Sequence, residues 1–241
     1  MPKETAAIFR LLEPVSWLKD FVLIGGTALS LHLGHRQSED LDFITPLPKL
    51  SRAELRNVEE LIRDAGHTIA QAYDPDAYDD FLNAGMDIRD YSQTWIIDGV
   101  VKLTFFTAEE HHRRLLEKED TRHSFRVAKL SEIAALKAIV ICERSKSRDW
   151  LDLFILEKDF HFGIRNWKEA YDKAGLTSAH FETGLKRICS GILQKSDEGF
   201  TMLLPDAPPL QEITSHFKAL REIYEISLAR ETLSQQRGTK G

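Results

Sequence analysis

The fold and chemistry of this chain are most constrained by residues 21–42, FVLIGGTALSLHLGHRQSEDLD. The stretch begins with four apolar residues, which are typical of a buried strand, and continues with Gly25 and Gly26. Residues 27–33 then predict a short helix. A strand that turns on glycines into a helix directs backbone N–H groups and the positive end of the helix dipole at one point. Such a turn is a binding site for an anion, most often phosphate.

Two carboxylates lie in the predicted strand that follows, at residues 40–44. Alternation along a strand places Asp40 and Asp42 on the same face, with Cα atoms about 6–7 Å apart. Paired carboxylates beside a phosphate-binding turn are what a site for magnesium and a nucleoside triphosphate requires. Each element has a plainer interpretation, as a tight glycine turn or a solvated strand end. Their order and spacing favour phosphate and metal chemistry.

The rest of the chain predicts an α/β fold, with a mixed sheet flanked by helices and a helical C-terminal region. We expect helices over residues 5–19 and 51–66, a strand over 68–73, an acidic loop over 74–86, a hairpin that turns at Asp98-Gly99, and two amphipathic helices around 181–192 and 213–228. We therefore expect two domains, an α/β core at 1–107 and a mostly helical domain at 108–241.

Composition narrows the class of protein. In 241 residues, 42% are hydrophobic and 29% charged, which is typical of a globular protein, and no apolar run approaches the length of a membrane span. The first residues do not resemble a signal peptide. The two cysteines lie in apolar helical patterns, so we expect reduced thiols and a cytoplasmic protein. The net charge of −6 argues against a general polyanion-binding protein, although a local basic patch would suffice for RNA.

A second group of polar residues lies in LKAIVICERSKSRDWLDL, residues 136–153. We expect a helix from about residue 130, with Ser131 as its N-cap and Lys137 at the border of its apolar stripe. From the pattern alone, Lys137 would extend to solvent. Asp149 would be a helix N-terminal charge that pairs with Arg148 or Lys137.

These two stretches together resemble the AbiEii/AbiGii toxin family of abortive-infection and toxin–antitoxin systems, whose members have a nucleotidyltransferase fold. Arg36 and Ser38, ahead of Asp-Leu-Asp, are typical of that family, as is a helix lysine followed by Arg-Asp-x-x-Asp-Leu. The resemblance covers residues 21–44 and 129–156. It implies that Lys137 and Asp149 act in the cleft of the enzyme, whereas Arg148 and Asp152 tie helices together.

The resemblance also implies a reaction: a nucleoside monophosphate passes from a triphosphate to an acceptor hydroxyl. Gly25, Gly26 and Thr27 would hold the phosphates, and Arg36 and Ser38 belong to the same nucleotide site. Asp40 and Asp42 would bind Mg²⁺, and with Lys137 and Asp149 they would form the catalytic set. The implied partners are a nucleoside triphosphate, an RNA acceptor such as the 3′ end of tRNA, and a cognate antitoxin.

One position departs from the family pattern. Nucleotidyltransferases usually carry a third carboxylate on a strand like residues 101–107, and here the corresponding position holds Thr104. This favours one alternative, a degenerate nucleotidyltransferase fold that binds without catalysis. Another alternative, a small-molecule nucleotidyltransferase of the antibiotic-modifying kind, shares the glycine and aspartate motifs but does not account for Lys137 and the Arg148-Asp149 string.

Overall fold

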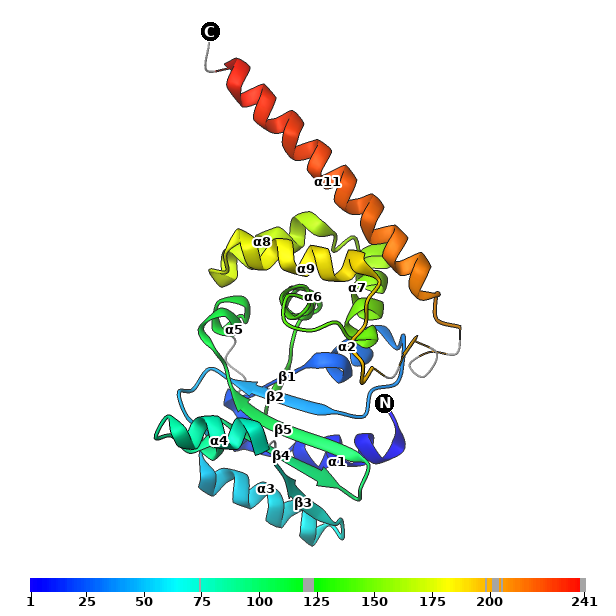
Figure 1. Cartoon of the computed structure of the whole chain (residues 1–241). Coiled ribbons are helices and arrows are strands. Elements are labelled where there is room, and N and C mark those ends of the chain that lie inside the picture. The colour runs from blue at the N-terminus through cyan, green and yellow to red at the C-terminus, as the bar shows by residue number, and fades with distance from the viewer. Residues whose placement is uncertain (74, 119–123, 198, 201–203, 205, 239–241) are drawn as a thin grey trace. The chain divides into compact units, whose positions relative to one another are not determined.

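The computed structural model describes the chain except for residues 74, 119–123, 198, 201–203, 205 and 239–241. The chain divides into two units, Met1–Ile133 and Ala134–Gly241 (Figure 1). The boundary expected at residue 107 falls inside the first unit. The reason is that the short strand β6 (Arg126–Val127) pairs in parallel with β1 (Val22–Ile24), so the segment after residue 107 still contributes to the sheet.

The first unit is built on a six-stranded mixed sheet in the order β3-β4-β5-β2-β1-β6. The pairs β2–β5 and β1–β6 are parallel, and the other neighbours are antiparallel. The remaining strands are β2 (Leu41–Thr45), β3 (Ile69–Ala72), β4 (Ser92–Ile97) and β5 (Val101–Thr107). The expected α/β fold, a mixed sheet flanked by helices, is confirmed.

The helices of this unit are α1 (Lys3–Leu12), α2 (Gly25–Leu33), α3 (Arg52–Asp64), α4 (Pro75–Asn83) and α5 (Glu110–Leu115), with 3₁₀ turns at Ser16–Asp20 and Ile88–Asp90. The helix expected over 5–19 is therefore shorter, because the chain turns at Pro14 and continues as a separate 3₁₀ helix. Ser51 caps α3, since its hydroxyl accepts the Glu54 N–H at 3.4 Å.

The prediction of an acidic loop over 74–86 was wrong, because α4 occupies most of it. Pro75 stands at the first helical position, where the fixed φ of proline fits and no N–H is needed. Tyr78, Phe81 and Leu82 follow at helical spacing, and the Phe81 ring lies 5.5 Å from that of Tyr91. The acidic residues suggested a solvated turn, but the apolar spacing beneath them is helical.

One face of the sheet carries the aromatic core of the unit. The rings of Phe43 and Phe105 stack with centroids 5.0 Å apart, and Trp95 lies edge-on to Phe105 at 6.1 Å. Helix α3 buries its apolar stripe, Leu55, Val58 and Ile62. Successive residues of a strand alternate between the two faces, so Asp42 and Thr104 lie on the opposite face.

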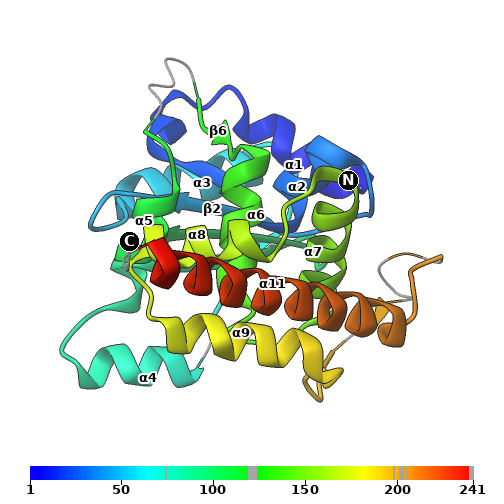
Figure 2. The same cartoon turned by 90° about the horizontal axis from the view of Figure 1, so that it is seen from above.

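The second unit is helical, as expected, with α7 (Ser147–Phe160), α8 (Ile164–Ala174), α9 (Ser178–Ser190) and α11 (Leu210–Gly238) following α6 (Leu130–Val140), which spans the boundary. Helices α9 and α11 pack together, with the rings of Phe181 and Tyr224 5.9 Å apart (Figure 2). Ile192, expected in the stripe of α9, lies beyond its end and is 71% exposed. No helix in the described ranges is long and apolar enough to cross a bilayer.

Ser131 is not the N-cap of α6, because the helix begins one residue earlier, at Leu130. The side chain that holds this end belongs to Glu132, whose carboxylate accepts the Lys129 N–H at 2.7 Å. The same carboxylate forms a buried ion pair with Arg126, also at 2.7 Å. The charged pair therefore takes the place of a serine cap.

Candidate functional site

The glycine turn brings backbone against the carboxylate strand. Helix α2 begins at Gly25, directly after β1, and Gly25 has φ 76°, in the left-handed region that favours glycine. A Cβ at Gly25 would lie 3.0 Å from Oδ2 of Asp42. The first N–H groups of α2 and the Asp42 carboxylate are therefore adjacent, which is the juxtaposition that the motif predicts.

The second glycine approaches two other predicted site residues. A Cβ at Gly26 would lie 2.7 Å from Nη2 of Arg36 and 2.8 Å from Oγ of Ser38. Arg36 is buried, and its Nη1 donates to the carbonyl of Gln37 at 2.9 Å. The guanidinium and hydroxyl thus lie where a side chain at residue 26 would otherwise project.

Thr27 and Asp40 meet through the backbone. The buried Thr27 hydroxyl donates to the main-chain carbonyl of Asp40, which fastens α2 to the start of β2. Asp40 comes just before β2, and Asp42 lies within it. The Thr27 hydroxyl thus holds the turn against the strand, and its backbone N–H belongs to the first turn of α2.

A row of polar side chains runs across the sheet from Asp42. Asp42 pairs with Thr104 on β5, and Thr104 pairs with Thr94 on β4, whose hydroxyl lies 3.4 Å from that of Thr104. Thr104 therefore occupies the strand position beside Asp42 at which the family pattern has a carboxylate. Thr94 was not singled out from the sequence.

The donor set suits a cation that is shared with a substrate. Within the described residues, no group of three or more histidine, cysteine, aspartate or glutamate side chains could hold a metal ion. Mg²⁺, however, is commonly bound by one or two carboxylates together with substrate phosphates. Asp40 and Asp42, next to a turn built for phosphate, fit that arrangement and not an all-protein cage.

Lys137 lies in a buried ion-pair network in the second unit. Its Nζ is 2.7 Å from Oδ1 of Asp149 and 2.9 Å from Oδ2 of Asp152. Nε of Arg144 is 2.8 Å from the other oxygen of Asp149. Lys137 is only 6% exposed and both aspartates are fully buried, so the interpretation that Lys137 extends to solvent is wrong. Lys137, Arg144, Asp149 and Asp152 are referred to below as the Lys137 network.

The ion pairs hold Lys137 and Asp149 in their charged forms. Burial by itself would lower the pKa of Lys137, but Asp149 and Asp152 raise it above its usual value. Burial would likewise raise the pKa of Asp149, whereas Lys137 and Arg144 lower it to about 2. Lys137 therefore carries a fixed positive charge across the physiological pH range.

The structure thus brings predicted residues together within each unit. Gly25, Gly26, Arg36, Ser38 and Asp42 meet in the first unit, with Thr27 joined to Asp40, and Lys137 meets Asp149 in the second. Asp152, expected to tie helices together, pairs directly with Lys137. The signal for this pairing was present, because residues 149 and 152 are one helical turn apart.

Known proteins are similar to this chain over most of its length. The family model described as "Nucleotidyl transferase AbiEii toxin, Type IV TA system" matches residues 6–224. The protein aq_aa25 of Aquifex aeolicus is 28% identical over 158 residues, which cover 64% of this chain and 66%, just under two thirds, of that protein.

Solved structures share the fold. JHP933 of Helicobacter pylori is 19% identical, with a TM-score of 0.50 over 97% of this chain and 96% of its own. MenT4, a nucleotidyltransferase toxin of Mycobacterium tuberculosis, is 16% identical, with a TM-score of 0.50 over 90% of this chain and 82% of its own.

Proposed function

Because the chain belongs to the nucleotidyltransferase AbiEii toxin family, we propose that it transfers a nucleoside monophosphate from a nucleoside triphosphate to an acceptor hydroxyl, with pyrophosphate leaving. The observation that carries the proposal is the close approach of the Asp42 carboxylate to the glycine turn, because it joins a phosphate site to a carboxylate. The acceptor we propose is RNA, such as the 3′ end of tRNA, and the biological role is that of a cytoplasmic toxin opposed by an antitoxin.

The glycine turn binds the triphosphate. The first N–H groups of α2, at Gly25, Gly26 and Thr27, lack partners within the helix and can donate to phosphate oxygens. The positive end of the helix dipole adds to their attraction. Arg36 and Ser38, which lie beside Gly26, supply a guanidinium and a hydroxyl to the same phosphates.

Asp40 and Asp42 hold magnesium at the start of β2. When bound, the ion neutralises phosphate charge and lowers the pKa of the attacking hydroxyl. The antiparallel pairing of Asp42 with Ile24 and its parallel pairing with Thr104 fix the strand that carries these carboxylates. Asp42 therefore needs little reorganisation when a nucleotide arrives.

Lys137 stabilises the negative charge that develops at the α-phosphorus. Its charge is held by Asp149 and Asp152, and a preorganised charge in a site that excludes water stabilises a transition state more than a mobile one does. Asp149 is the residue that positions Lys137, because its second oxygen is held in turn by Arg144.

The test is label transfer. The purified full chain is incubated with each radiolabelled nucleoside triphosphate, magnesium and total tRNA, and labelled RNA is separated on a gel. Asp42→Asn should lower transfer by about 10²–10³-fold, equivalent to several kcal/mol of charge stabilisation. The matched control is Asp64→Asn, at the exposed end of α3, which should label RNA as the wild type does. Transfer that persists in Asp42→Asn would refute the proposed metal site.

A second candidate function follows from one observation. Thr104 stands beside Asp42 where a third carboxylate is expected, which favours a protein that binds nucleotide without transferring it. Calorimetric titration with a nucleoside triphosphate and magnesium separates the two functions. Binding that Asp42→Asn abolishes, without any labelling of RNA, protein or small acceptors by the wild type, would support this candidate and refute the enzymatic one.

A further inference from the structure

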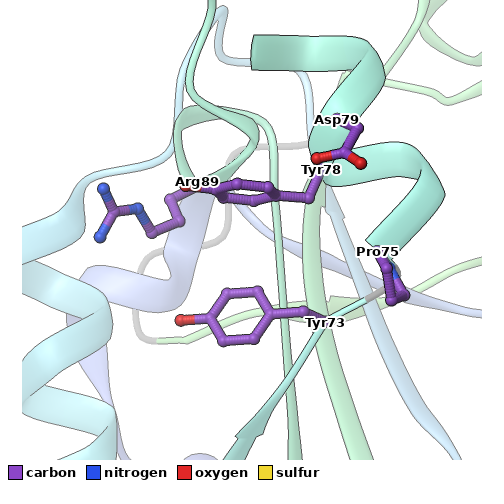
Figure 3. Close-up of a pocket in the computed structure, with 5 residues that line it drawn as sticks. All are labelled: Tyr73, Pro75, Tyr78, Asp79 and Arg89. Carbon is purple, nitrogen blue, oxygen red and sulfur yellow. The ribbon is translucent and has the colours of Figure 1, made fainter.

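A pocket of about 370 Å³ lies at the end of the edge strand β3 in the first unit. It is lined by Tyr73, Pro75, Tyr78, Asp79 and Arg89, and Figure 3 shows the two tyrosine rings near each other with the arginine beside them. The ring centroids are 6.3 Å apart and the ring planes are nearly perpendicular, at 75°, so the rings meet edge to face. The tyrosines are 52% and 40% exposed. The volume is at the lower end of the range of roughly 300–1,000 Å³ that is typical of small-ligand sites.

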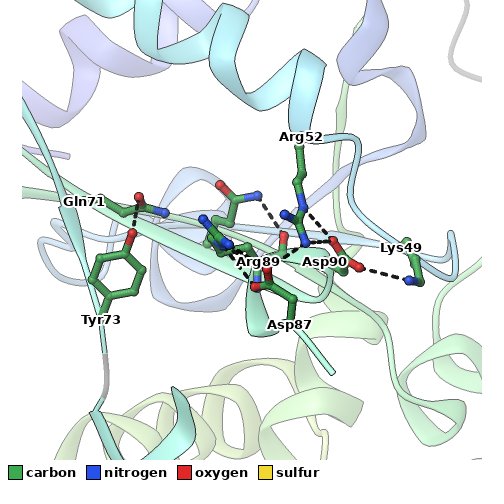
Figure 4. Close-up of polar contacts among 8 residues, drawn as sticks. Lys49, Arg52, Gln71, Tyr73, Asp87, Arg89 and Asp90 are labelled. Atoms are coloured by element: carbon green, nitrogen blue, oxygen red, sulfur yellow. Dashed lines mark hydrogen bonds and ion pairs between the residues drawn. The ribbon is translucent and has the colours of Figure 1, made fainter. Parts of the chain in front are cut away.

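The Arg89 side chain is fixed by an ion pair with Asp87. Its guanidinium makes a forked contact with the Asp87 carboxylate, with Nε 3.0 Å from Oδ1 and Nη2 2.7 Å from Oδ2 (Figure 4). Asp87 also pairs with Arg52 at 2.9 Å, and the Gln93 amide donates to the carbonyl of Arg89 at 2.8 Å. The guanidinium plane is therefore preorganised, which suits stacking on a flat ligand.

The described lining of the pocket carries one cation, Arg89, and one carboxylate, Asp79. Behind the lining, Asp87 pairs with Arg89 and Arg52, and Asp90 pairs with Arg52 and Lys49 (Figure 4). A site for backbone phosphate would carry an excess of positive charge. Two exposed aromatic rings, a flat guanidinium and a carboxylate acceptor instead match a nucleobase, which offers a face for stacking and amino groups for hydrogen bonds.

The pocket belongs to the same sheet as the carboxylates. The row of strand partners that starts at Asp42 continues through Thr104 and Thr94 to Ala72 on β3, and Tyr73 follows Ala72 directly. Three steps between neighbouring strands of ~4.8 Å amount to about 15 Å from Asp42. A nucleoside triphosphate whose phosphates lie at Asp42 would reach this distance only when fully extended, whereas ~15 Å corresponds to about four stacked nucleotides at ~3.4 Å each.

We propose that this pocket binds a base of a single-stranded RNA acceptor, a few nucleotides before the hydroxyl that reacts. The inference rests on the proposed nucleotidyltransferase function, because that function sets the position of the reacting end. In the pocket, the base lies against Tyr73 and Tyr78, Arg89 covers its edge or face, and Asp79 accepts from an exocyclic amino group. The pocket thereby contributes to the choice and alignment of the acceptor.

Direct binding tests the pocket without requiring transfer. The full chain is titrated into a fluorescein-labelled single-stranded RNA, with anisotropy as the readout. Tyr73→Ala and Tyr78→Ala should each weaken binding by roughly 5- to 150-fold, the equivalent of ~1–3 kcal/mol for one stacked base. Tyr73→Phe and Tyr78→Phe keep the rings and should bind as the wild type does. Leu82→Ala, an exposed residue of α4 outside the pocket lining, is the matched control.

An abasic scan locates the base that the pocket holds. An abasic nucleotide is placed in turn at each position near the 3′ end. In the wild type, one position within about four nucleotides of that end should weaken binding. In Tyr73→Ala, the penalty at that position should vanish, because the interaction is already lost. This coupling between the abasic position and Tyr73 identifies the pocket, whereas a merely structural defect weakens binding at every position.

Three results would overturn the inference. The first is wild-type protein that binds no single-stranded RNA, and the second is alanine variants that bind it as the wild type does. The third is variants that raise only the KM for the nucleoside triphosphate, which would mean that the pocket binds the base of that nucleotide. Wild-type protein that shows the coupling but transfers no label would leave the base site standing while refuting the proposed enzymatic activity. The two failures are therefore distinguishable.

Discussion

Replacement of Lys137 by methionine is the most direct perturbation of the buried network. The substitution keeps most of the length of the side chain but removes the ammonium group that pairs with Asp149 and Asp152, both fully buried. Removal of one partner from a buried ion pair typically costs ~3–5 kcal/mol, because the other charge stays in a medium that solvates it poorly. At ~2–4 °C per kcal/mol for a chain of this size, Lys137→Met should lower the melting temperature by about 6–20 °C.

The assay is urea denaturation followed by tryptophan fluorescence, since Trp150 is buried on α7 beside the network. Lys186→Met, on the exposed side of α9, is the control and should change the unfolding free energy by less than ~0.5 kcal/mol. The double variant Lys137→Met with Asp152→Leu removes one charge of each sign and keeps the pair of Asp149 with Arg144, so it should recover most of the lost stability.

Measuring nucleotide transfer by the same variants distinguishes a structural role of Lys137 from a catalytic one. The double variant should remain deficient in nucleotide transfer, because no positive charge stands at residue 137. A stable double variant with wild-type transfer would show that Lys137 is structural alone. A single variant Lys137→Met that unfolds within ~1 kcal/mol of the wild type would refute the reasoning about the buried charges themselves.

The difference in unfolding free energy between the wild type and Lys137→Met depends on pH in a direction that the pKa shifts determine. The raised pKa of Lys137 stabilises the fold fully below the unfolded value of ~10.4, and this contribution is lost as the pH rises through the folded pKa. The lowered pKa of Asp149 acts in the opposite sense: its contribution is complete above ~3.9 and is lost as the pH falls toward about 2. The gap in unfolding free energy between wild type and Lys137→Met should therefore narrow as the pH rises through the folded pKa of Lys137, and should also narrow in acid, where the buried carboxylates are protonated. Urea midpoints measured from acid to alkaline pH check it, and a gap that grows as the pH rises through the folded pKa of Lys137 would contradict it.

The remaining predictions concern the nucleotide site. In Gly26→Ala, the new Cβ would lie 2.7 Å from Nη2 of Arg36 and 2.8 Å from Oγ of Ser38, so both must move, and the KM for the nucleoside triphosphate should rise by about tenfold in steady-state assays. In Thr104→Asp, a carboxylate directly opposite Asp42 should destabilise the metal-free protein by ~0.2–1 kcal/mol. Magnesium should reverse that loss in thermal melts and half-saturate transfer at a lower concentration; a variant indifferent to magnesium would contradict the shared cation site.

The strand–turn–helix–strand unit could be predicted because its determinants are local. An apolar run, two glycines and an alternating Asp-x-Asp each act through neighbouring backbone, and the structure places α2 and β2 accordingly. Helix α4 was missed because its acidic surface resembles a solvated loop, although the spacing of Tyr78, Phe81 and Leu82 is helical. In that segment, the acidic residues predicted a loop, but the helical spacing of the apolar residues determines the structure.

The pairing of Thr104 with Thr94 depends on one extra residue in the hairpin. Asp98 and Gly99 have the positive φ values, 51° and 74°, of the expected tight turn. Val100 then lies outside the ladder, so Ile97 pairs with Val101 and Thr94 with Thr104. A strict two-residue hairpin would have placed Leu103 opposite Thr94. A shift of one residue exchanges the faces of a strand, so this row could not be derived from the turn motif alone.

The burial of Lys137 could not be derived from a helical pattern either, because a lysine at the edge of an apolar stripe can turn outward at little cost. Its position is decided by Asp149 and Asp152, which lie one turn apart on α7 and offer two carboxylates to one ammonium group. A buried network of this kind seldom adds stability over well-packed apolar side chains. A role for the charge itself therefore explains the arrangement better than stability does, which is why the apolar double variant, stable but deficient in transfer, is the decisive comparison.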